Sequence, residues 1–554
     1  MKSAQENSIQ WSMLVIVGVL VLYPLGWIVW VSGTPGGHLS ASAYTNLFAD
    51  SALWSSFAHS VGVASASSII ALFFGVPLAF LAVRTDLAIR RWISLLAMVP
   101  FITPAFIGGL AWVVLGAPRT GLLNFAGRWL GLSEPWLNMY SLGGMICTLG
   151  VYMSPYVFVV TSAVLASVDP SLEEAAALSG SRTPRILWSI VLPLAIPGIA
   201  AGALLAFVNS VEQFGIPQIL GRPANVFVLP TEIYSLMNRM PQETAQASAA
   251  SMLLLALSAI AVVVQQKIVT RRSYVTVGGK GYRQRRFALG PWRYLAYLFV
   301  GFYTIVAVAL PVAALLLSSF LAAGTLSLAG NSFGMRHYAY LFKAYPATIR
   351  SLRNGIVFST IGATIALALA VTSAYFISRY RSRLSTALRT LITVPLALPG
   401  IVIGTGMLLA YIRPPLVLYG TLWILIVSYI TRFLPFAERT GSAAFQQLDR
   451  SLEEASVVCG AGWLRTFRWV LLPLIRPALI GGWLLLFVSM IHELGTSVLL
   501  YSFGNEVPAV VLFDLLDSGN MGAMSAYATV LLALSIVVVV ILQRLVRIDL
   551  IPST

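Results

Sequence analysis

Continuous apolar runs of about 20 residues recur along the whole chain, separated by short polar segments. A helix of that length crosses a hydrocarbon layer about 30 Å thick, whereas the strands of a membrane barrel would appear as alternating segments of about 10 residues. The pattern therefore predicts about twelve transmembrane helices, near residues 11–31, 57–83, 93–115, 141–166, 193–220, 246–268, 294–320, 354–378, 391–412, 419–437, 473–501 and 522–543.

The composition agrees with this pattern. Hydrophobic residues make up 58% of the 554 residues and charged residues only 10%, against about 25% charged residues in soluble domains. The mean hydropathy is +0.86. These values exclude a soluble globule and favour an all-α polytopic membrane protein. The first run, 11–31, is too long and too aromatic for a signal peptide, so we expect it to be retained as a span.

The charge is strongly basic, with 35 Lys and Arg against 19 Asp and Glu, a net +16. Cytoplasmic loops of membrane proteins collect Lys and Arg, and placing both termini in the cytoplasm puts most of these residues there. Residues 269–293 form an expected basic cytoplasmic linker that would face membrane lipid headgroups rather than nucleic acid. The two cysteines, Cys147 and Cys459, suggest neither a disulfide framework nor a zinc site.

The chain is an internal duplication. Residues 169–220 align without a gap on residues 449–500, so each residue matches the one 280 positions later. We expect two halves, 1–268 and 294–554, with six spans each, the same topology and an axis along the membrane normal, which favours a pathway between them. Upstream, matched pairs recur 295 positions apart: Arg84 and Arg379, Pro100 and Pro395, Pro104 and Pro399, and Gly109 and Gly404.

One polar loop after the fourth span of each half carries the same spaced motif. Residues Ser171 to Ala177 and Ser451 to Val457 are predicted to form short helices, with Ser as the N-cap and a Glu at the third position, as in a capping box. A glycine is expected to end each helix. The motif residues are Glu174, Ala175, Ala176 and Gly180 in loop 169–193, and Glu454, Ala455, Ser456 and Gly460 in loop 449–473.

These loops resemble the EAA loop of the inner-membrane permeases of ATP-binding-cassette importers. The resemblance implies a type I importer permease fold in a bacterial plasma (inner) membrane, with each loop docked on one of two copies of a cytoplasmic ATPase subunit. It also implies an extracytoplasmic substrate-binding protein as a partner. Ser456 departs from the motif, where Ala is preferred, by a small-for-small change.

The chain itself is expected to be neither an enzyme nor a cofactor carrier. The pair Gly279-Lys280 lacks the glycine spacing of a phosphate loop. ATP and Mg²⁺ would be used by the partner ATPase. The four histidines form no cluster with the spacing of metal ligands, so no tightly bound metal is expected.

Polar residues are rare within the predicted spans, where they are costly and usually functional. Two hypotheses remain open for them: they line the translocation path or its gate, or they join helices through hydrogen bonds. Tyr152, Met153 and Tyr156 are weaker candidates, because aromatic residues at helical spacing usually pack. The candidates are Asn209, Glu212 and Gln213 in the fifth span and Ser489, His492 and Glu493 in the eleventh.

The segments that follow these residues carry a narrower resemblance. Residues 492–501 and 511–514 in the second half, and 212–217 in the first, are similar to the ferric-iron permeases, in which one chain holds both halves. That resemblance implies ferric iron delivered by a binding protein. Fused permeases for 2-aminoethylphosphonate or thiamine share the loops and stay as alternatives.

A transporter of another class, a proton-coupled secondary transporter, can also consist of two six-span halves. It would carry a glycine-rich Asp-Arg loop between the second and third spans. Residues 84–91 lack those glycines, which disfavours this alternative.

Overall fold

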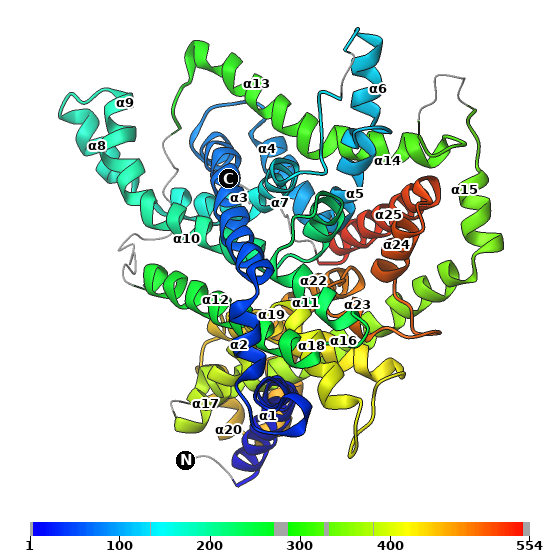
Figure 1. Cartoon of the computed structure of the whole chain (residues 1–554). Helices are drawn as coiled ribbons and strands as arrows, with labels where there is room; N and C mark the ends of the chain where they lie inside the picture. Colours follow the sequence, from blue (N-terminus) through cyan, green and yellow to red (C-terminus); the bar gives the residue numbers. More distant parts are fainter. Residues whose placement is uncertain (1–3, 133–134, 271–285, 326–331, 381, 547–554) are drawn as a thin grey trace.

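The computed structural model describes residues 4–132, 135–270, 286–325, 332–380 and 382–546, which form helices joined by short turns (Figure 1). Two isolated bridges, Thr85 with Phe287 and Leu321 with Phe333, are the extended pairings within these residues. Most of the expected linker, 271–285, lies outside the described residues.

The long helices follow the predicted spans closely. In the first half they are α1 (Ala4–Gly33), α3 (Ser51–Arg84), α4 (Arg90–Ile102), α5 (Ala105–Gly116), α7 (Leu142–Ser167), α10 (Leu192–Val211) and α12 (Thr244–Thr270). In the second half they are α13 (Arg293–Thr304), α14 (Leu310–Phe320), α16 (Pro346–Arg379), α17 (Arg383–Thr393), α18 (Gly400–Tyr411), α19 (Leu422–Gln446), α22 (Leu472–Ile491) and α25 (Met521–Val546).

Shorter helices connect the spans. They are α2 (Ser42–Ala49), α6 (Leu122–Trp129), α8 (Pro170–Leu178), α9 (Thr183–Ile186), α11 (Leu229–Asn238), α15 (Arg336–Ala339), α20 (Ser451–Val458), α21 (Trp463–Thr466), α23 (Ser497–Leu500) and α24 (Pro508–Asp517).

The described residues contain nine helices long and apolar enough to cross a membrane, or eleven if two bent pairs each count as one span. The remaining predicted span is α19, whose 25 residues include the charged Arg432, Glu438 and Arg439. The expected twelve spans are therefore all present as helices, but two are bent and one is partly charged.

The third and ninth spans, predicted at 93–115 and 391–412, are each broken into two helices. The pair α4 and α5 is bent by 91°, and the pair formed by α17, its short continuation to Ala397, and α18 is bent by 109°. Each bend falls at a proline, Pro104 or Pro399, which lacks a backbone N–H and disfavours helical geometry in the residue before it.

The fifth and eleventh spans also end earlier than the predicted 193–220 and 473–501. Helix α10 ends at Val211 and α22 at Ile491. The chain then passes through irregular segments at 212–214 and 492–496 before helical turns resume. The polar residues singled out in the sequence therefore lie mainly at chain breaks.

The first long helix of each half packs against helices of the other half. Tyr23 of α1 donates a hydrogen bond to Ala410 O of α18 at 3.4 Å. Its counterpart 280 residues later, Tyr303 of α13, lies 3.0 Å from Ser154 Oγ of α7. One large hydrophobic core contains residues of both halves. The duplicated units are thus interlocked rather than merely adjacent.

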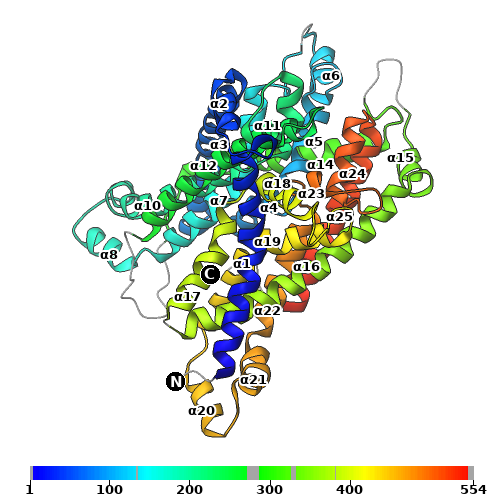
Figure 2. The ribbon, with the colours of Figure 1, turned by 60° about the horizontal axis from the view of Figure 1, so that its bottom comes forward.

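Helices α8 and α20 lie at one end of the molecule. In Figure 2 α8 appears at the left edge and α20 at the bottom, with the start of α1 beside α20, whereas α6 and α15 lie at the upper right. We refer to the part of the molecule that carries these two helices as the α8/α20 end.

Candidate functional site

An aspartate makes the same hydrogen bond at the start of α8 and of α20. The side chain of Asp169 accepts a hydrogen bond from Ser171 N at 2.9 Å, and that of Asp449 accepts one from Ser451 N at 2.9 Å. This bond holds the pKa of Asp449 below its ordinary value. The predicted capping box is therefore wrong, because an aspartate two residues upstream satisfies the amide that the box would have used.

Both helices end at a glycine in the left-handed region, as predicted. Gly180 and Gly460 each have φ +80°. The following amides, Ser181 N and Ala461 N, donate back to Ala176 O and Ser456 O at 3.0 and 3.1 Å. This pattern closes the last turn and satisfies carbonyl groups that a helix end leaves free.

The tips of α8 and α20 present the motif residues to the surroundings. Glu174, Ala175, Glu454 and Ala455 are all exposed. Two matched apolar residues are almost fully exposed, Leu178 at 90% and Val458 at 87%. Ser456 stands where the motif prefers Ala. Its hydroxyl lies 2.9 Å from Thr466 Oγ1, so it has a hydrogen-bond partner within the chain.

A duplicated ion pair ties each of these helices to a long helix. Arg84, the last residue of α3, pairs with Glu173 of α8, and both side chains are 0% exposed. Arg379, the last residue of α16, pairs with Glu453 of α20 at 2.6 Å, with side chains 10% and 15% exposed. Sequence reasoning missed both pairs, although the matched positions of the two arginines and of the two glutamates were visible signals.

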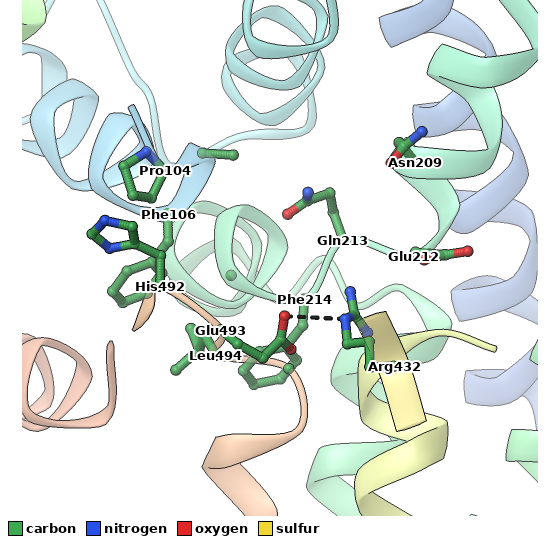
Figure 3. A pocket seen from close by; sticks show the side chains of 14 residues that line it. Pro104, Phe106, Asn209, Glu212, Gln213, Phe214, Arg432, His492, Glu493 and Leu494 are labelled. Carbon is green, nitrogen blue, oxygen red and sulfur yellow. Dashed lines mark ion pairs between the residues drawn. The ribbon is translucent and has the colours of Figure 1, made fainter. Parts of the chain in front are cut away.

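The chain breaks of four spans meet at one cavity of about 180 Å³ between the two halves (Figure 3). It is lined by Asn209, Glu212 and Gln213 from the first half and by His492 and Glu493 from the second. We call it the central cavity. Five of the six candidates therefore share one cavity. Ser489 does not line it and instead donates to Leu485 O within α22.

An arginine that sequence reasoning did not single out completes the cavity. Arg432 Nε of α19 lies 3.0 Å from Glu493 Oε2, the ion pair drawn as a dashed line in Figure 3. Glu493 Oε1 also accepts from Thr496 N at 3.1 Å and so orders the turn after α22. The available signal was a lone arginine within an otherwise apolar run.

The other two ionisable residues at the breaks do not join this pair. His492 Nε2 lies 2.7 Å from Ser535 Oγ of α25. In Figure 3 the side chain of Glu212 points away from Arg432 and Glu493. Under the hypothesis that these residues join helices, Glu212, His492 and Glu493 could have paired with one another. The structure does not show that arrangement.

Glycines allow close packing at the wall of the central cavity, where Gly400 lies, and between α5 and α7. A Cβ at Gly400, the first residue of α18, would overlap the guanidinium of Arg432. A Cβ at Gly108, in the first turn of α5, would overlap the ring of Tyr152. Close approach at these positions requires the absence of a side chain.

The weaker aromatic candidates in α7 are packing residues by their surroundings. Tyr152 and Met153 are each 2% exposed within the hydrophobic core. Tyr156 makes an edge contact with Phe101, with ring centroids 5.4 Å apart. Within the described residues, no three His, Cys, Asp or Glu side chains are placed to hold a metal ion.

Comparison with known proteins assigns the family. The model of the binding-protein-dependent transport system inner membrane component matches residues 68–274 and 362–548, one match in each half. The chain is 28% identical over 498 residues to the ferric transport system permease protein FbpB of Actinobacillus pleuropneumoniae, covering 88% of this chain and 70% of that protein.

Two further relatives bear on the alternatives. The chain is 30% identical over 452 residues to a Haemophilus influenzae protein named for ferric transport, FbpB 1, covering 79% of this chain and 69% of that protein. It is 28% identical over 241 residues to a Salmonella typhi protein named for 2-aminoethylphosphonate transport, PhnV, covering 43% of this chain and 89% of that protein. With two family matches in one polypeptide, the chain belongs to the inner-membrane components of binding-protein-dependent transport systems, as a fused two-half permease of an ATP-binding-cassette importer.

Proposed function

We propose that this chain forms the translocation pathway of an importer for ferric iron. The observation that carries the proposal is the extent of the match: relatives named for ferric transport align over both halves, 88% and 79% of the chain. The relative named for 2-aminoethylphosphonate transport aligns over 43%. That substrate is the second candidate.

Two copies of a cytoplasmic ATPase subunit dock on α8 and α20 in this proposal, and they use the ATP and Mg²⁺. The support is local. Both helices are anchored by an ion pair at one side and expose a matched apolar residue, Leu178 or Val458, at the other. An exposed apolar residue beside Glu174 or Glu454 suits a protein partner that covers it.

The α8/α20 end faces the cytoplasm in this proposal, and both termini lie on that side of the bacterial inner membrane. An extracytoplasmic binding protein then delivers iron at the opposite end. The family description names a binding protein as part of these systems. The start of α1 lies beside α20 in Figures 1 and 2, which supports an N-terminus on the same side of the membrane as α20.

The central cavity is the membrane-embedded part of the path. It holds two carboxyl groups, Glu212 and Glu493, against one guanidinium, Arg432. Such groups are costly within a membrane and are typical of ion pathways. A cation released into this cavity would meet an excess of acidic groups. Ser489 has no place in this path, since it does not line the cavity.

The test of the substrate is transport by the assembled complex. The permease is reconstituted in vesicles with its ATPase and binding protein, and uptake of ferric iron, 2-aminoethylphosphonate and thiamine is measured with and without ATP. We expect ATP-dependent iron uptake. Uptake of aminoethylphosphonate in its place selects the second candidate. Uptake driven by a proton gradient without ATP would contradict the importer proposal.

The test of the path is charge removal with shape retained. Glu212→Gln and Glu493→Gln should abolish iron uptake while the complex still assembles and its ATPase is still stimulated. Ser489→Ala is the matched control, because Ser489 lies near the end of α22, just before Glu493 in the chain, but does not line the cavity. Unchanged uptake in both glutamine variants returns these residues to a structural role.

A further inference from the structure

A second cavity, of about 360 Å³, lies between the halves toward the α8/α20 end. It is bounded by the end of α12 from the first half and by α16, α17 and α19 from the second. We call it the exit cavity. Its polar lining includes Gln266, Arg389, Glu438, Arg439, Ser442 and Gln446.

Helix α19 connects the exit cavity to the central cavity. Arg432 lines the central cavity, and Pro435, Arg439 and Ser442 line the exit cavity. Residues spaced by three and four positions lie on one face of a helix, so these four form a single stripe along α19. The ninth span contributes to both cavities as well, through Gly400 in one and Leu396 in the other. About one helical turn separates the two cavities.

The first half has no equivalent of this stripe. Helix α7 aligns with α19 at the offset of 280 residues, so Pro155 corresponds to Pro435. At the positions of Glu438 and Arg439 it has Phe158 and Val159, and Phe158 is buried in the hydrophobic core. The duplicated position of Ser442 is Ser162, whose hydroxyl is buried.

We propose that cargo leaves the central cavity on one side only, through the exit cavity and along the polar face of α19. The cargo class is a polar or hydrated ion, because the lining mixes charges of both signs with amides and a hydroxyl. Arg389 and Arg439 outnumber Glu438 there, whereas acidic groups outnumber Arg432 in the central cavity. A cation is therefore attracted at the first cavity and is not held at the second, as conduction requires.

The identity of the cargo rests on the proposed function, but the route does not. It is tested by cysteine accessibility in the full complex, starting from a chain in which Cys147 and Cys459 are replaced by serine. Ser442→Cys is compared with Ser162→Cys, its matched control in α7. A membrane-impermeant, positively charged thiol reagent is applied from the α8/α20 end. We expect modification at position 442 at least tenfold faster than at position 162, followed by loss of transport.

The outcomes separate clearly. Equal reactivity at the two positions overturns a one-sided exit. No reactivity at position 442, or modification there that leaves transport unchanged, overturns the exit cavity as a route. If the complex transports 2-aminoethylphosphonate rather than iron, the iron proposal fails. Faster modification at position 442, followed by loss of 2-aminoethylphosphonate transport, would still support the route.

A second variant pair uses one helix as its own control. Arg389 lines the exit cavity, whereas Arg383, six residues earlier on α17, is exposed outside it. Arg389→Gln should change the maximal transport rate at least threefold without changing the amount of assembled complex, and Arg383→Gln should not. Equal effects would attribute both to surface charge and overturn the role of Arg389 in the route.

Discussion

The two halves keep the same backbone breaks around the central cavity but fill them with different side chains. Proline breaks the third and ninth spans at matched positions, Pro104 and Pro399. The position that holds Arg432 in α19 holds the buried Tyr152 in α7. Likewise, Gln213 stands where the second half has Glu493. The duplicated fold thus supplies a common scaffold, whereas the ion pair belongs to one half.

The α8/α20 end shows the opposite relation. There the two halves keep the same chemistry, an arginine at the end of a long helix paired with a glutamate of a short one. They differ in burial, because the first pair is fully enclosed and the second is partly exposed. Charge pairing that joins the membrane helices to the short helices is therefore common to both halves, whereas the ion pair of the central cavity, Arg432 with Glu493, belongs to the second half alone.

The largest expected effect comes from breaking the enclosed ion pair. Arg84→Ala leaves Glu173 buried without its arginine and should lower the free energy of unfolding by about 3–5 kcal/mol. Arg379→Ala should cost less, about 1–3 kcal/mol, because water reaches Glu453 and screens it. Thermal unfolding of the purified permease measures the difference. Equal losses of stability would mean that burial does not distinguish the two ion pairs.

A smaller effect is expected at the cavity pair, which the first half lacks. Arg432→Gln should lower the free energy of unfolding by about 2–3 kcal/mol, since Glu493 keeps Thr496 N but loses its counterion. The double variant Arg432→Gln, Glu493→Gln should recover most of that stability without recovering iron uptake. If the double variant transports normally, the pair serves packing alone.

Two closely packed glycines, Gly108 between α5 and α7 and Gly400 at the central cavity, allow a steric comparison. Gly108→Ala presses on the buried ring of Tyr152 and should cost about 1–3 kcal/mol of stability. Gly400→Ala presses on the flexible end of Arg432, so it should cost less stability but displace the guanidinium from Glu493. Unfolding measurements together with uptake assays distinguish the two. A stable Gly108→Ala variant and an unfolded Gly400→Ala variant would reverse this ranking.

The smallest effect should be equal in the two halves. Gly180→Ala and Gly460→Ala each force a side chain into φ +80° and should each cost about 1 kcal/mol. Among the described residues, neither Cβ would meet another atom within 4 Å. A bulky residue such as Trp at both positions should additionally weaken copurification of the ATPase. Normal copurification and transport would count against docking at these helix ends.

The sequence predicted the span positions, the duplication and the ends of α8 and α20 well, because these depend on local properties. Run length specifies a membrane helix, and glycine specifies a left-handed helix end. The same local reasoning misplaced the capping of α8, since it chose the serine and overlooked Asp169. It also gave the third and ninth spans as single segments without placing a break in either, although Pro104 and Pro399 were visible signals for one.

The pairings between distant residues were decided only by the tertiary structure. Arg432 and Glu493 are 61 positions apart, and Arg84 and Glu173 are 89 apart, so no local pattern joins them. The exchange of α1 and α13 between the halves and the exit cavity along α19 depend likewise on how helices pack. The sequence by itself determined which segments cross the membrane and which type of importer they serve. Packing determined which polar groups meet, because a charge in a membrane interior is tolerated where the fold gives it a partner or a polar cavity.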